Sequence, residues 1–148
     1  MRKEAETVVI RDIREKDYPE VARIWRDVLD IPVTDECLAE TYDKMGKDDR
    51  YATFVAEEDG RVVGLIATVV CLAIGHPSGY TKINGLVVLP EHRGKGIGRM
   101  LIEKAEEFAK ANGTMYLGLA SGLQRKTAHA FYEHMGYQKT SYWFRKRL

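Results

Sequence analysis

A glycine-rich turn between an apolar strand and an amphipathic helix constrains this chain more than any other feature. Residues 86–90 read LVVLP, which is typical of the end of a buried strand, and residues 93–98 read RGKGIG. Apolar side chains then recur at helical spacing, at Ile97, Leu101, Ala105, Phe108 and Ala109. A strand that passes through glycines into such a helix belongs to a sheet with helices packed on its faces.

The glycines predict an anion site where this helix begins. The first N–H groups of a helix have no partner within it, and the backbone dipole makes that end partly positive. Gly94, Gly96 and Gly98 let several N–H groups converge and let a bulky anion approach them. With Arg93 and Lys95 beside them, the segment predicts a site for a diphosphate, whereas glycine content alone is also compatible with a tight, mobile turn.

Two common phosphate motifs do not fit this segment. The GxxxxGK[ST] pattern of the P-loop is absent from the chain. A dinucleotide fingerprint that starts at Gly94 requires glycine at position 99, which is Arg99, and it normally follows an early first strand. Neither motif therefore accounts for the glycines of this segment.

Two segments together resemble the GNAT superfamily of N-acetyltransferases. Arg93, Gly96 and Gly98 form the RxxGxG pattern of its acetyl-CoA-binding motif, directly after the strand. Residues 128–137, AHAFYEHMGY, are similar to the A-x-x-F-Y-E-x-x-G-F/Y segment of the family. The resemblance covers residues 51–148 well, and the first fifty residues match only as a β-α-α pattern. It implies acetyl-CoA as co-substrate and an enzyme that acetylates a primary amine by direct attack in a ternary complex.

The resemblance also implies the residues that bind the coenzyme. The backbone of Leu86 and Val88 pairs with the pantetheine arm, while the turn holds the pyrophosphate. Gly85 lies where the family often has a bulge that splays two strands. The implied coenzyme-binding residues are Leu86, Val88, Arg93, Gly94, Lys95, Gly96, Ile97 and Gly98.

Tyr132 is the implied catalytic residue, because it aligns with a tyrosine that many relatives place near the sulfur of CoA. Its phenol is expected to protonate the departing thiolate. The chain departs from the family at Asn84, where many relatives have a glutamate, and at Arg125, where they often have asparagine. The general base therefore stays open, with four candidates by residue type: Glu40, Glu57, Glu58 and His76.

The fold expected is α+β (mixed α/β), with a central, mostly antiparallel, splayed sheet flanked by helices in one domain over residues 1–148. The expected order is β-α-α-β-β-β-α-β-α-β. Strands are predicted at 7–11, 51–58, 61–73, 80–89, 115–120 and 137–145. Helices are predicted from an Asp17 N-cap, from Thr34 or Asp35, from Ile97 to Asn112-Gly113, and over 126–134.

Charge and cysteine content exclude several other classes. Lys and Arg number 23 against 22 Asp and Glu, and a net charge of +1 gives no support to nucleic acid or a membrane surface as partner. The longest apolar run, residues 65–74, is half of what a membrane span needs. Cys37 and Cys71 lack metal-site spacing, so no metal is expected, and the N-terminus lacks an export-type apolar run, which favours the cytoplasm.

Three further expectations concern assembly, acceptor and activity. The aromatic run Tyr142-Trp143-Phe144 suggests a homodimer interface. The acceptor, a small-molecule or protein amine, stays open, since a fold does not fix a substrate. The alternative from another class is a catalytically inactive CoA-binding regulatory or sensor module, for which Asn84 is the strongest argument.

Overall fold

The structure is a computed structural model that describes residues 7–148. The described chain forms two compact units, one that ends at Gly118 and one that spans Leu119–Leu148. The segment MRKEAE, with which the charged N-terminus begins, lies outside the described residues.

The first unit is built on a sheet whose strands follow one another in chain order. They are β1 (Val8–Asp12), β2 (Tyr51–Glu58), β3 (Arg61–Ala73), β4 (His76–Val88) and β5 (Leu117–Leu119). From β1 to β4, each strand pairs antiparallel with the next, which confirms the mixed, mostly antiparallel fold. The bounds of β2 and β3 are those predicted, because Asp59 and Gly60 take the positive φ values, 51° and 76°, that a tight hairpin turn requires.

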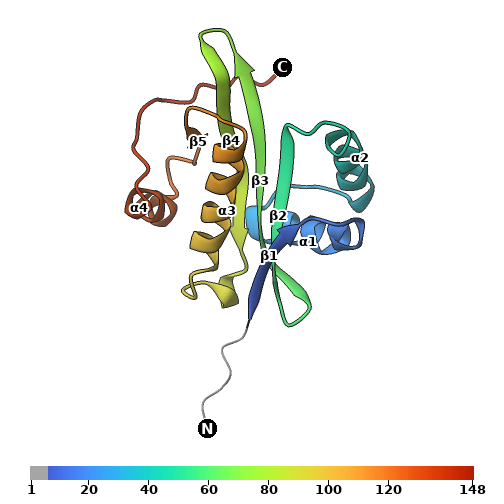
Figure 1. The fold of residues 1–148 in the computed structure, drawn as a ribbon. Coiled ribbons are helices and arrows are strands. Elements are labelled where there is room, and N and C mark those ends of the chain that lie inside the picture. The colour runs from blue at the N-terminus through green and yellow to red at the C-terminus, as the bar shows by residue number, and fades with distance from the viewer. Residues whose placement is uncertain (1–6) are drawn as a thin grey trace. The chain divides into compact units, whose positions relative to one another are not determined.

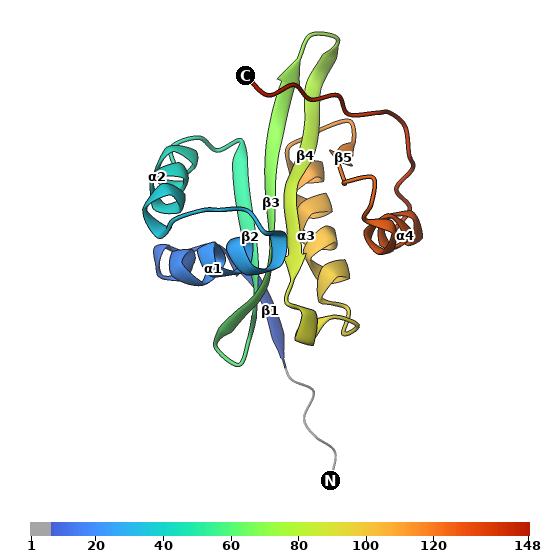
Figure 2. The same ribbon diagram turned by 180° about the vertical axis from the view of Figure 1, so that it is seen from behind.

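Helices cover both faces of this sheet. The helices α1 (Tyr18–Leu29) and α2 (Asp35–Met45) lie on one face, and α3 (Ile97–Ala111) lies on the other (Figures 1 and 2). Successive side chains of β2 lie on opposite faces of the sheet. Val55 packs in the core under α1, whereas the ring centre of Phe54 lies 6.1 Å from that of Phe108 in α3. No helix within residues 7–148 has the length and apolarity to cross a membrane.

The starts of the first two helices differ in how they are capped. Thr34 caps α2, because its hydroxyl accepts from the backbone N–H of Cys37 at 3.1 Å. Asp17 stands at the N-cap position of α1 as predicted, yet its side chain does not cap the helix. The carboxylate instead accepts two hydrogen bonds from Arg11, at 2.7 and 2.9 Å, and this guanidinium lowers the pKa of Asp17. A bidentate pair with arginine is stronger than one bond to a backbone N–H.

The strand leading to the glycine turn begins earlier than predicted. We expected a loop over residues 75–79 and a strand from Tyr80, but β4 begins at His76. The hairpin turn is confined to Ile74 and Gly75, where Gly75 takes a φ of 88°. His76 therefore pairs with Ala73, and after an irregularity over residues 77–79 the antiparallel pairing with β3 resumes at Tyr80.

The second unit confirms one element and corrects another. The helix α4 (Lys126–His134) has the predicted bounds and is followed by Gly136 with a φ of 94°. The strand predicted at 137–145 is wrong, because these residues form no regular structure. Its residues have strand propensity, but a strand forms only where a neighbour takes its backbone hydrogen bonds, and the described sheet ends at β5.

Candidate functional site

The glycine turn joins β4 to α3 and leaves the start of the helix open. Gly94 and Gly96 have φ values of 79° and 84°, in the left-handed region that favours glycine. Gly96 is the N-cap of α3, and no side chain caps the helix there. A Cβ atom built on either glycine meets no atom within 4 Å. The space beside both glycines is therefore free of protein atoms, which is what an anion-binding nest at an uncapped helix start requires.

Side chains beside the glycines tie the turn to the sheet. Arg93 donates from Nε to the carbonyl of Val88 at 3.1 Å, so it closes the turn onto the end of β4. His92 Nδ1 lies 2.7 Å from Oε2 of Glu58, and Lys95 Nζ lies 3.5 Å from Oε1 of the same carboxylate. The turn is thus held by the last residues of β2 and β4, the two strands that flank β3.

The strand β4 carries a bulge six residues before the 3-10 helix η2 (Pro90–His92) begins. Ala67 pairs with Gly85, but the next residue of β3, Thr68, pairs with Ile83, so Asn84 is the extra residue. Its side chain is exposed. A bulge bends its strand and re-aims the neighbouring backbone groups, as the sequence predicted for this position.

The indole of Trp25 in α1 packs directly on the bulge. A Cβ built on Gly85 would lie 2.4 Å from Cη2 of Trp25, closer than two carbon atoms approach. Glycine is therefore required at position 85 by the packing of α1 against β4, and its φ is not the reason.

Tyr132 belongs to the second unit and lies within its aromatic cluster. The ring centre of Tyr132 is 5.5 Å from that of Phe131 and 6.1 Å from that of Tyr137. Burial raises the pKa of Tyr132 above its ordinary value of 10.0, and the nearby charge of Arg125 opposes this only in part. The phenol therefore keeps its proton at neutral pH and is chemically suited to act as an acid.

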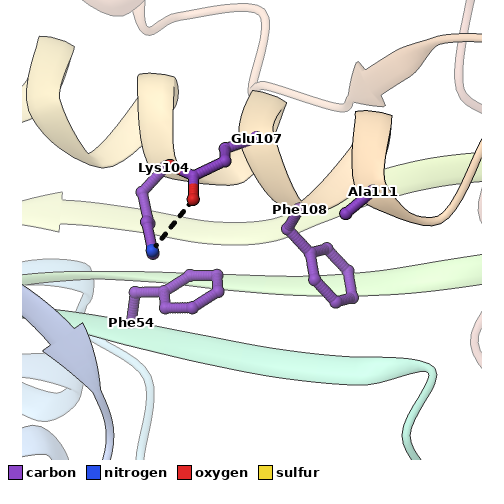
Figure 3. A pocket seen from close by; sticks show the side chains of 5 residues that line it. All are labelled: Phe54, Lys104, Glu107, Phe108 and Ala111. Atoms are coloured by element: carbon purple, nitrogen blue, oxygen red, sulfur yellow. Dashed lines mark hydrogen bonds and ion pairs between the residues drawn. The ribbon is translucent and has the colours of Figure 1, made fainter.

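A pocket lies on the α3 face of the sheet (Figure 3). Its cavity of about 200 Å³ is lined by Phe54 of β2 and by Lys104, Glu107, Phe108 and Ala111 of α3 (Figure 3). Lys104 lies over the ring of Phe54, 5.5 Å from its centre, and pairs with Glu107 at 3.4 Å. The charged groups that line this pocket satisfy each other, and none of the predicted site residues lines it.

Comparisons with known proteins identify the family. The sequence model of the Acetyltransferase (GNAT) family matches residues 10–137. The Uncharacterized N-acetyltransferase YhdJ of Bacillus subtilis is 33% identical over 132 residues, which cover 88% of this chain and 89% of that protein. The chain belongs to the acetyltransferase (GNAT) family.

Other relatives of this GNAT protein are more distant or only partly aligned. The aminoalkylphosphonate N-acetyltransferase of Salmonella typhimurium is 36% identical over 94 residues, which cover 64% of this chain and 61% of that enzyme. The aminoglycoside N-acetyltransferase AAC(6')-Iy, solved in complex with CoA, has a TM-score of 0.86 at 17% identity, with 100% of both chains covered. The latter similarity establishes a shared fold.

The GNAT fold accounts for the arrangement of the predicted residues in the first unit. The turn brings Arg93, Gly94, Lys95, Gly96, Ile97 and Gly98 together at the start of α3, and Leu86 and Val88 lie between the bulge and the turn. Sequence reasoning missed the contacts of Glu58, because its partners lie 34 and 37 residues away along the chain. The one available signal for these contacts was that β2, a largely apolar strand, ends in the carboxylate of Glu58.

The four candidates for the general base have different surroundings. Glu57 accepts from Nε of Arg11 at 3.3 Å, and Glu58 is held by the turn as described. Glu40 is an exposed residue of α2. The ring of His76 lies 6.1 Å from those of Tyr80 and Tyr116, in an aromatic cluster near the β3–β4 hairpin turn. None of these contacts singles out one base.

Replacing Gly85 tests the packing of α1 on the bulge. We expect Gly85→Ala to lower the free energy of unfolding by about 1–3 kcal/mol, because the added methyl group overlaps the indole of Trp25. Trp25→Leu in the Gly85→Ala background should restore part of this loss, which urea denaturation measures. The control is Gly118→Ala, where the added Cβ would lie at an ordinary 3.6 Å from Tyr116. Equal losses at both glycines would contradict the assigned contact.

Proposed function

We propose that this GNAT protein transfers the acetyl group of acetyl-CoA to a primary amine of a small molecule. The observation that carries the proposal is the open nest at Gly94 and Gly96, which stands at the uncapped start of α3. A diphosphate needs several converging donors in a space free of side chains, and the turn offers both. The CoA complex of the similarly folded AAC(6')-Iy supports this choice of ligand.

The pantetheine arm follows β4 in this proposal. Leu86 and Val88 lie between the bulge at Asn84 and the turn, and we expect their backbone groups to pair with the amides of the arm. The carbonyl of Val88 already accepts from Arg93, and a carbonyl oxygen has a second lone pair for a further donor. The bulge frees backbone groups at the position where the thioester would end.

The reaction proceeds by direct attack of the amine in a ternary complex. The amine nitrogen forms a bond to the thioester carbon, and the bond from that carbon to sulfur breaks. Tyr132, which its raised pKa keeps protonated at neutral pH, gives its proton to the departing thiolate. The amine loses a proton to a base or to water, and for an alkyl amine this costs about 4 kcal/mol at pH 7.

A panel of amines tests the function and narrows the acceptor. The names of relatives suggest two chemical classes, because an aminoalkylphosphonate is anionic and an aminoglycoside is cationic. The acidic residues of α1 and α2 and of the segment between them favour the cationic class; they are Asp27, Asp30, Asp35, Glu36 and Glu40. Steady release of thiol with one class identifies the acceptor.

Binding of CoA in calorimetry without turnover on any amine supports the alternative, which is an inactive regulatory module. The exposed Asn84, where many relatives have a glutamate, is the argument for it.

The cytoplasm is the compartment we propose for this reaction. Cys37 and Cys71 are free thiols in the structure, and cytosolic proteins keep their thiols reduced. Acetyl-CoA as co-substrate agrees with this location.

A charged side chain in the nest should abolish coenzyme binding. We expect Gly96→Asp to raise the Kd for CoA by about 100-fold or more, because the carboxylate repels the diphosphate and fills its place. Calorimetry measures the Kd. Gly113→Asp is the matched control, since Gly113 also has a positive φ, 67°, but follows the other end of α3. Unchanged affinity in a folded Gly96→Asp protein would refute the position of the diphosphate.

Removal of one hydroxyl tests the role of Tyr132. We expect Tyr132→Phe to lower kcat by about 100-fold, the usual contribution of a general acid, and to leave the Kd for CoA unchanged. Because burial raises the pKa of the phenol above 10.0, its deprotonation should cause no loss of rate in the wild-type protein up to pH 9. Tyr137→Phe, which changes the adjacent ring in the same way, should retain wild-type kcat. Wild-type turnover of Tyr132→Phe across this pH range would remove Tyr132 from the mechanism.

A homodimer is the assembly we propose. Tyr142, Trp143 and Phe144 are 83%, 68% and 90% exposed, and a run of exposed aromatic residues is typical of an interface. Sedimentation should give twice the chain mass of 16.9 kDa. We expect the double variant Tyr142→Ser, Phe144→Ser to sediment as a monomer and Leu72→Ser, at an exposed position of β3, to remain a dimer. A monomeric wild-type protein at micromolar concentration would exclude the dimer.

A further inference from the structure

The carboxylate of Glu58 is buried at the end of β2 and joined to both sides of the glycine turn. Its side chain is 3% exposed, whereas those of its partners His92 and Lys95 are 25% and 43% exposed. His92 precedes the nest as the last residue of η2, and Lys95 stands between its two left-handed glycines. One buried group therefore fixes the turn at a point before the nest and at a point within it.

The contacts of this carboxylate engage both of its oxygens. Its Oε2 lies 2.7 Å from Nδ1 of His92, which is within hydrogen-bond distance. The ammonium of Lys95 is drawn toward the sheet, 3.5 Å from Oε1. A buried carboxylate loses its hydration, so bonds to its two oxygens compensate for a large desolvation cost and are hard to give up.

We propose that Glu58 is a positioning residue for the diphosphate of CoA, which rests on the function proposed above. It acts through His92 and Lys95, which hold the N–H groups of the turn in their converging arrangement before the coenzyme arrives. Donors that are already in place cost no ordering free energy on binding. The contribution of Glu58 is therefore confined to the affinity for the diphosphate and leaves the chemical step unchanged.

Electrostatics alone predicts the opposite change in CoA affinity when Glu58 is replaced. A carboxylate beside an anion site repels the anion, so its neutralisation would tighten binding if charge were the main effect. Loss of a positioning residue weakens binding even though a repulsive charge disappears. The direction of the change therefore separates the two explanations.

Glu58→Gln tests the proposal, because it keeps the shape of the side chain and removes the charge. We expect the Kd for CoA and the KM for acetyl-CoA to rise about tenfold, the size expected for weakened charge-assisted hydrogen bonds. The kcat and the KM for the amine should stay at wild-type values, whereas a large fall in kcat would identify Glu58, one of the four candidates, as the general base and overturn the positioning role. Inhibition by 3′-phospho-ADP should weaken by the same factor, and inhibition by pantetheine, which lacks the diphosphate, should not change.

Asp17→Asn is the matched control for the loss of a buried carboxylate. Asp17 is 4% exposed and paired with Arg11, so its substitution should lower the melting temperature without raising the KM for acetyl-CoA. Lys95→Met removes one partner of the carboxylate and should also raise the KM for acetyl-CoA. In the double variant with Glu58→Gln, the two losses should be less than additive. If Glu58→Gln does not fold, His92→Phe serves in its place, because His92 is partly exposed and its substitution removes the 2.7 Å contact with Glu58; it should raise the KM for acetyl-CoA and leave kcat unchanged.

The outcomes distinguish this inference from the proposed function. Absence of CoA binding to the wild-type protein would overturn the function and the inference with it. Normal binding to the wild-type protein, with unchanged or tighter binding to Glu58→Gln, would overturn the inference alone. Additive losses in the double variant would also overturn it, because they would mean that Lys95 contacts the phosphates independently of Glu58.

Discussion

The left-handed conformation of Gly94 and Gly96 is the constraint on which the rest of the site depends. A residue with a Cβ atom pays roughly 1–2 kcal/mol to adopt this conformation. Two such residues, separated only by Lys95, turn the chain from the end of β4 into the first turn of α3 and leave the N–H groups uncapped. The same two glycines therefore set the direction of α3 and leave several backbone N–H groups uncapped, and these are the donors that a diphosphate needs.

The two faces of the sheet contribute separately to this arrangement. On the α3 face, the helix carries its own uncapped N–H groups to the end of β4. On the other face, α1 packs its Trp25 against Gly85 and so requires a strand with no side chain at that point. The bulge at Asn84 lies next to this contact, since the pairing with β3 shifts between Thr68 and Ala67. The glycine beside the bulge is thus required by the packing of α1, whereas the glycines of the turn are required by their left-handed backbone conformation.

Local patterns in the sequence predicted much of the fold. The Asp-Gly pair fixed the β2–β3 hairpin, and the apolar period and glycine end predicted α3 and α4, because each signal acts within a few residues. The predictions failed where a distant partner decides the outcome. Asp17 prefers the guanidinium of Arg11 to its own helix, and residues 137–145 lack the neighbouring strand that their β propensity would need.

The same distinction explains how much of the candidate site could be foreseen. The nest is local, so its residues followed from the RxxGxG pattern, whereas the carboxylate that holds it lies on β2 and is visible only in three dimensions. A turn with Arg93, Lys95 and no carboxylate would attract an anion more strongly at long range, but physiological salt screens such attraction beyond about 8 Å. Hydrogen bonds to aligned N–H groups act at contact, where geometry matters most. A buried negative charge beside an anion site is therefore consistent with binding when its effect on geometry exceeds its repulsion.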